Sequence, residues 1–194
     1  MEDVKLILFL GIVATVCTTF LSAGNIAFER ASLIFNRRLY QTILEKFEVP
    51  LRENDIIEEK FEENFDIQTI GTTTYYIAKK KKKNTVIFKA HGPGLWGTIE
   101  VLLAVNPDFE RMLWLKVLAQ TETPGLGGRI AEDEFQRRFN DALLRPEIKI
   151  VKFASGPNEI DAVTGASMTS LALEKLINKA IRELDLAFGR ENIQ

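Results

Sequence analysis

The first part of the chain is a long apolar stretch that contains no charged residue. From Leu6 to Phe28 there are 23 residues without an Asp, Glu, Lys, Arg or His. As a helix, a stretch of this length spans about 34 Å, which is enough to cross a hydrocarbon core of about 30 Å. A cleaved signal peptide is the alternative, but Lys5 is the only base before the stretch, and the apolar run is longer than a signal-peptide core. We therefore expect residues 1–28 to be a retained membrane anchor.

Helical patterns continue beyond the anchor. Residues 29–47 place apolar side chains at helical intervals, and Pro50 is expected to end that helix. Residues 48–66 are rich in acidic residues, and their apolar side chains again recur at helical intervals. This pattern predicts a helix with its carboxylates on the solvated face. We expect residues 29–66 to be linking helices that lead to a domain over residues 67–194.

Runs of β-branched and apolar residues follow, and they predict two hairpins. Residues 72–78 and 85–90 flank five consecutive lysines, which are expected at the tip of the first hairpin. The lysines could meet anionic lipid or an acidic partner, but lysines at a strand edge also prevent aggregation, and we favour that interpretation. Residues 97–105 and 111–119 predict the second hairpin, joined by a turn at residues 106–110.

The remainder of the chain mixes helix, strand and loop. Residues 132–144 are expected to be a short helix, residues 148–153 a strand, and residues 154–170 a loop rich in small residues. Residues 171–188 carry one apolar stripe at helical spacing, which predicts a closing helix. Strands that pair as hairpins and cluster among helices indicate an α+β domain.

Composition and charge exclude several functions. With 25 Lys and Arg against 27 Asp and Glu, the net charge is -2, which is not typical of a nucleic-acid-binding protein. A hydrophobic content of 46% excludes a disordered chain. One cysteine, Cys17, and one histidine, His91, exclude a Cys/His zinc site, an iron–sulfur cluster held by this chain and an internal disulfide.

Two segments of small residues are candidates for a binding site. Thr121–Gly128 follows an apolar strand and includes Pro124-Gly125, a pair that favours a tight turn with or without a ligand. Asp161–Ser170 leads into the closing helix, where backbone N–H groups and the helix dipole favour a phosphate, although Ser and Thr also serve as N-caps. The segment lacks the GxxxxGK[ST] pattern, so we do not expect a nucleoside triphosphate.

Three segments, in order, resemble those of the RnfG/NqrC family of membrane-anchored FMN-binding subunits. Thr164–Ser170 (TGASMTS) resembles the family's flavinylation motif, Gly94–Gly97 its GLW segment, and Glu122–Gly127 its ETPGLG turn. The resemblance implies that FMN is attached through a phosphoester to the last threonine of the motif, Thr169. The further cofactor-binding residues that we expect come from all three segments: Leu95, Trp96, Glu122, Thr123, Pro124, Gly125, Leu126, Thr164, Gly165, Ala166, Ser167, Met168 and Ser170.

The resemblance also implies a function. In this family the flavin relays electrons inside an ion-translocating oxidoreductase, so we expect no catalytic residue and no metal site in this chain, because the cofactor does the chemistry. The length is nearer to the G subunit of an Rnf-type ferredoxin:NAD complex than to the C subunit of an Nqr-type NADH:quinone complex. The Nqr-type protein is the alternative, as is a membrane-anchored FMN-binding regulatory or sensor domain. The implied partners are other membrane subunits, including flavin and iron–sulfur subunits, and a flavin transferase during maturation.

The expected location is the plasma (inner) membrane, with a single pass. In the family the C-terminal domain lies outside the cytoplasm. Lys5 precedes the span whereas Arg30, Arg37 and Arg38 follow it, and this count alone would leave the domain in the cytoplasm. We follow the family placement, because folded domains can cross a membrane despite so small a charge difference.

The pairing of the second hairpin predicts where the flavin ring lies. Gly94–Trp96 stands at the start of one strand and Glu122–Leu126 at the end of the other, so antiparallel pairing brings them to one edge of the sheet. The Thr169 loop must reach the same edge. We expect Leu95, Trp96 and Leu126 to contact the ring and Glu122 and Thr123 to face the ribityl chain or the ring edge; a core position for Trp96 is the alternative.

Overall fold

The computed structural model describes residues 2–79 and 85–189, and it divides the chain into two compact units. The first unit is Met1–Glu63 and the second is Asn64–Gln194. Most of the expected lysine-rich tip, residues 80–84, lies outside the described residues.

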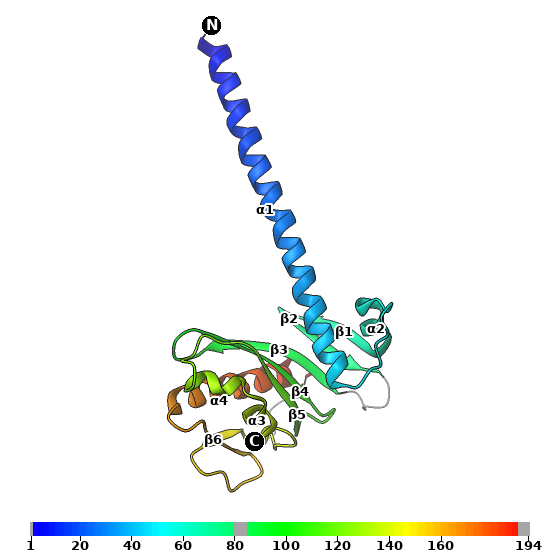
Figure 1. Cartoon of the computed structure of the whole chain (residues 1–194), viewed down its shortest axis with the longest axis vertical. Coiled ribbons are helices and arrows are strands. Elements are labelled where there is room, and N and C mark those ends of the chain that lie inside the picture. Colours follow the sequence, from blue (N-terminus) through cyan, green and yellow to red (C-terminus); the bar gives the residue numbers. More distant parts are fainter. Residues whose placement is uncertain (1, 80–84, 190–194) are drawn as a thin grey trace. The chain divides into compact units, whose positions relative to one another are not determined.

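The first unit is mainly one long helix. Helix α1, Glu2–Lys46, is uninterrupted over 45 residues and is drawn in blue to cyan in Figure 1. The anchor and the amphipathic segment therefore form one helix, because no proline lies between them. Within α1, Ile7–Asn25 is long and apolar enough to cross a membrane. Helix α2, Ile57–Asn64, follows, and the ring of Tyr40 stacks on that of Phe61 with 4.0 Å between centroids.

The second unit is built on a five-stranded antiparallel sheet, which confirms the α+β class. Its strands pair in chain order, as Figure 1 shows: β1 (Phe65–Ile70), β2 (Thr73–Ala78), β3 (Val86–Pro93), β4 (Thr98–Val105) and β5 (Met112–Ala119). Both expected hairpins are present, as β2 with β3 and β4 with β5. Strands β3 and β4 also pair, across the Gly94–Gly97 turn. Strand β1 adds an edge strand that was not expected: residues 65 and 66 were assigned to the linking helices, and residues 67–71 to no helix or strand.

The elements after the sheet differ in length from those that the sequence pattern indicates. They are the 3-10 helix η1 (Gly127–Ala131), helix α3 (Asp133–Arg137), the parallel pair β6 (Lys149–Val151) and β7 (Glu159–Asp161), and helix α4 (Ser167–Ala187). The helix expected over residues 132–144 is only α3, and the chain later turns at Asp141, whose φ is 66°. Strand β7 lies where a loop was expected.

Helix α4 covers one face of the sheet, and its burial fixes where its first turn lies. The stripe predicted from the sequence is buried in one core with side chains of β2 to β5: Leu173, Leu176, Ile177, Ala180, Ile181 and Leu184 pack with Tyr75, Phe88, Val101, Leu103 and Leu115. Burying a Leu or Ile side chain contributes about 1.5–3 kcal/mol. A Cβ at Gly92 would lie 3.2 Å from Leu176 Cγ, so the end of β3 approaches α4 closely.

Candidate functional site

Glu122 connects the three segments singled out from the sequence. Its Oε2 accepts a hydrogen bond from the hydroxyl of Thr169 at 2.5 Å. Its Oε1 accepts the backbone N–H groups of Leu95, at 2.8 Å, and Trp96, at 3.0 Å. One carboxylate therefore holds the β3–β4 turn, the segment after β5 and the first turn of α4 together.

This arrangement gives Glu122 a structural role beside the one expected toward the cofactor, which stays a prediction. The side chain is 4% exposed, and both of its oxygens accept hydrogen bonds from inside the protein. The carboxylate therefore faces inward. The reason is that the buried hydroxyl of Thr169 and two part-buried backbone N–H groups need an acceptor, and a buried donor without one costs about 1–3 kcal/mol.

Two glycines make room for this connection. A Cβ at Gly94 would collide with Glu122 Oε1, and a Cβ at Gly127 would lie 2.5 Å from Thr169 Oγ1. Gly94 also closes the β3–β4 turn, since its N–H donates to the carbonyl of Gly97 at 2.6 Å. These close approaches are the physical reason for a glycine in the GLW segment and in the ETPGLG turn.

The hydroxyl groups of residues 164–170 fall into two classes. Thr169 and Ser170 are 2% and 1% exposed, and Ser170 Oγ accepts the N–H of Val163 at 3.2 Å. Thr164 and Ser167 are exposed. The sequence alone could not separate these classes, because the predicted helix began at residue 171 and left all four in a loop.

The start of α4 is suited to an anion. Ser167 is its first residue, and the N-cap residue, Ala166, makes no side-chain cap hydrogen bond. Gly165 precedes it with a φ of 81°, a conformation that glycine adopts without strain. First-turn N–H groups without a side-chain cap, together with the helix dipole, favour a negative charge here.

Exposed apolar side chains surround this helix start. They come from all three segments and from the next turn of α4: Leu95, Trp96, Leu126, Met168 and Leu171. Trp96 is 70% exposed, so it is not a core residue. Leu126 lies against the loop before α4, because a Cβ at Gly165 would be 3.4 Å from its Cδ2.

The turn that contains the other expected residues is exposed as well. Thr123, Pro124 and Gly125 are exposed, and Gly125 has a φ of 74°. The Thr123 carbonyl accepts the N–H groups of Leu126, at 3.1 Å, and Gly128, at 2.9 Å. The structure thus brings every expected site residue to one end of the sheet; that they contact FMN stays a prediction.

A groove of about 500 Å³ runs along α4 from this place. One wall is the end of β3 and the following turn, residues 91–95. The other wall is one face of α4: Met168, Leu171, Ala172, Lys175, Leu176 and Lys179. The sequence analysis missed Leu171, Lys175 and Lys179 as candidate site residues, although successive steps of three, four and four residues from Met168 place them on the same helix face. No cluster of His, Cys, Asp and Glu suited to a metal ion occurs among the described residues.

Comparisons with known proteins agree with this geometry. Residues 94–182 match the model of the FMN-binding domain family. The G subunit of the proton-translocating ferredoxin:NAD(+) oxidoreductase complex of Clostridium ljungdahlii is 33% identical over 120 residues, which are 61% of this chain and 64% of that protein. The C subunit of the Na(+)-translocating NADH-quinone reductase of Vibrio anguillarum is 31% identical over 123 residues, 59% of this chain and 48% of that protein.

The fold is also that of a solved protein. The C subunit of the Na(+)-translocating NADH-quinone reductase from Parabacteroides distasonis superposes with a TM-score of 0.65 at 19% identity, covering 80% of this chain and 93% of that one. The matched region spans less than two thirds of the length of the two relatives named above. Residues 94–182 therefore correspond to an FMN-binding domain, and the chain is similar in sequence to these G and C subunits and in fold to an Nqr-type C subunit.

Proposed function

We propose that this chain is the FMN-carrying electron-transfer subunit of a membrane-bound, ion-translocating oxidoreductase of the Rnf type. The observation that supports this most is the convergence of the three family segments on Glu122, at the end of the sheet inside the FMN-binding domain. The alternative, an Nqr-type C subunit, has comparable identity, but the match covers 48% of that relative against 64% of the Rnf-type one.

The residues at this end of the sheet fit FMN. The uncapped start of α4 offers backbone N–H groups to a phosphate. Leu95, Trp96, Leu126 and Met168 offer exposed apolar surface to a flat aromatic ring. FMN would supply electron transfer one or two electrons at a time, and the chain would hold and orient it.

Covalent attachment of FMN is part of this proposal. The burial of each hydroxyl group bears on which residue carries the phosphoester. A phosphoester needs a hydroxyl oxygen that a phosphorus atom can approach. The Thr169 oxygen is buried, donates to Glu122 and lies where a Cβ at Gly127 would collide with it. Ser167 is exposed at the first position of α4, beside the N–H groups that favour the phosphate. We place the attachment at Thr169, the residue that the motif implies, which requires its hydroxyl to leave Glu122; the exposed Ser167 is the alternative.

Anchoring through α1 and an extracytoplasmic FMN domain complete the proposal. Such a domain would exchange electrons with other membrane subunits, and covalent attachment would stop FMN from diffusing away. A flavin transferase would be needed on the same side of the membrane.

The test is to express the full chain with a flavin transferase and to measure its mass after denaturation, together with the flavin fluorescence of the gel band. We expect covalent FMN on the unsubstituted chain and on Ser167→Ala and Thr164→Ala, and none on Thr169→Ala, shown to be folded by circular dichroism. If Ser167→Ala loses the flavin and Thr169→Ala keeps it, the attachment is at Ser167. If the unsubstituted chain retains no flavin after denaturation, covalent attachment is wrong.

A further inference from the structure

The groove along α4 has an apolar floor and a basic rim. Leu95, Leu171 and Leu176 contribute apolar surface, and Lys175 and Lys179 are the charged side chains of its helical wall. No aspartate or glutamate lines the groove among the described residues. The groove therefore suits a flat apolar group that carries a negative charge.

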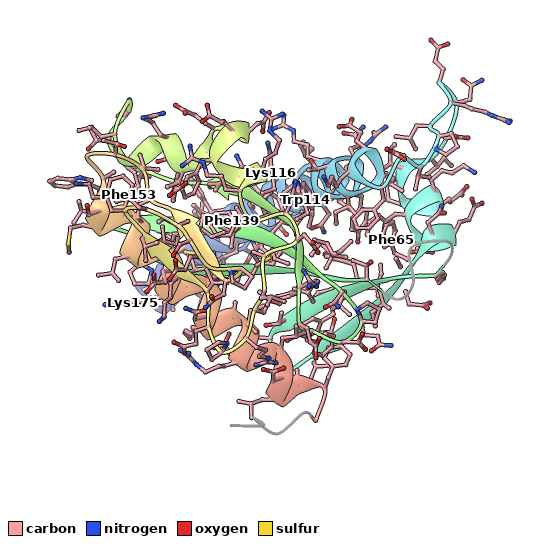
Figure 2. The ribbon with its side chains drawn as sticks, turned by 90° about the horizontal axis from the view of Figure 1, so that it is seen from below. Phe65, Trp114, Lys116, Phe139, Phe153 and Lys175 are labelled. Atoms are coloured by element: carbon pink, nitrogen blue, oxygen red, sulfur yellow. The ribbon has the colours of Figure 1, made fainter. Side chains whose placement is uncertain are left out.

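Of the two lysines that line the groove, Lys175 has the charge that is available to a ligand. It is exposed on α4, as Figure 2 shows, and no carboxylate in the described part of the chain forms an ion pair with it. Lys179 lies one turn further along the helix, with its Nζ 3.6 Å from Glu183 Oε1. Lys175 and Met168 are seven residues apart on one face of α4, a distance of about 10 Å along the axis. A group attached at the start of α4 can extend along the groove toward Lys175.

We infer that the flavin ring of the FMN-loaded protein lies in this groove and that Lys175 stabilises the negative charge of the reduced ring. The inference rests on the proposed function. When the ring takes up two electrons from a lower-potential carrier and one proton from water, it gains one negative charge. A cation at the rim favours that charged state over the neutral oxidised one, just as an opposite charge favours the ionised form of an acid. Lys175 thereby raises the midpoint potential of the flavin.

The experiment is spectroelectrochemical titration of the flavinylated full chain and of two variants, Lys175→Gln and Lys175→Glu. At the midpoint potential of the unsubstituted protein, we expect Lys175→Gln to lower the ratio of reduced to oxidised flavin by about two- to fivefold, the range of one partly exposed charge interaction. Lys175→Glu should lower it further, and 1 M salt should reduce both differences, because salt screens exposed charges.

Lys152→Gln is the matched control. It removes the same charge from a side chain that contacts the ring of Phe153 and does not line the groove. Its ratio should equal that of the unsubstituted protein. The inference would be overturned if the ratio shifted equally in Lys152→Gln and Lys175→Gln. It would also be overturned if the ratio shifted in neither of the two Lys175 variants.

A second measurement tests the position of the ring itself. Leu171→Ala should expose a ring that lies in the groove, so iodide should quench flavin fluorescence more strongly than in the control Leu186→Ala, which alters an exposed residue at the other end of α4. Equal quenching in the two variants would place the ring elsewhere. Failure of the proposed function gives a different result, namely an unsubstituted chain that carries no reducible flavin.

Discussion

Thr169 and Glu122 lie 47 residues apart in the chain and share a buried hydrogen bond of 2.5 Å. The bond runs between the first turn of α4 and the segment after β5. Because the other oxygen of Glu122 accepts the N–H groups of Leu95 and Trp96, the pair belongs to a connection of three chain segments. These buried polar groups thus hold the three segments together.

Loss of the Glu122 carboxylate should destabilise the second unit. Glu122→Ala leaves two backbone donors and the Thr169 hydroxyl without their acceptor, so we expect the free energy of unfolding to fall by about 2–5 kcal/mol. Glu122→Gln keeps one carbonyl oxygen and should cost less. Urea unfolding of the full chain in detergent, followed by circular dichroism, measures both changes.

The same pair provides a coupling test. Thr169→Val removes one donor and should cost about 1–3 kcal/mol. If the two side chains act through their hydrogen bond, Glu122→Gln combined with Thr169→Val should cost less than the sum of the two single changes. Strict additivity would show that the Glu122–Thr169 hydrogen bond does not contribute to stability.

Glu159 should make stability depend on pH. Its carboxylate accepts the N–H groups of Ser155, at 2.9 Å, and Gly156, at 3.1 Å, and the hydroxyl of Ser155. These hydrogen bonds, that of the Ser155 N–H first, lower the pKa of Glu159 below its ordinary value of 4.5. Since the folded pKa is the lower one, the stabilisation is complete above the unfolded pKa and is lost as the pH falls through the folded pKa.

The check is to measure the free energy of unfolding of Glu159→Gln and of the unsubstituted chain across that acidic range. At neutral pH the variant should be less stable than the unsubstituted chain, and the difference should shrink as the pH falls below 4.5. Glu110→Gln removes the same charge from an exposed side chain and reports the effect of net charge alone. If the difference for Glu159→Gln does not change with pH, the hydrogen bonds of the 155–159 loop do not stabilise the carboxylate.

The convergence of two of the three segments follows from the sequence, because it needs only antiparallel pairing. Residues 94–96 precede β4 and residues 122–126 follow β5, so the hairpin itself brings them to one end. The apolar stripe of residues 171–188 likewise predicts α4, since helical burial has a period that the sequence displays. Patterns that repeat along the chain are the ones that could be predicted.

The true start of α4 could not be predicted in this way. Its N-cap is Ala166, which offers no side-chain oxygen, so the usual signal for a helix start is missing. Because the helix begins at Ser167, Thr169 turns inward to Glu122 and Ser167 stays exposed. Strands β6 and β7 were missed or shortened for a related reason: three residues each are too few to show a period.

The orientation in the membrane should place residues 64–194 outside the cytoplasm. We propose a test in a Cys17→Ser background, which removes the only cysteine of the chain. Phe153→Cys alters a side chain that is 78% exposed in the second unit, and Val4→Cys alters one that is 64% exposed before the span. With a membrane-impermeant maleimide on intact cells, Phe153→Cys should react, whereas Val4→Cys should react only after lysis. The opposite pattern would mean that Arg30, Arg37 and Arg38 keep the domain in the cytoplasm, as the charge count alone predicts.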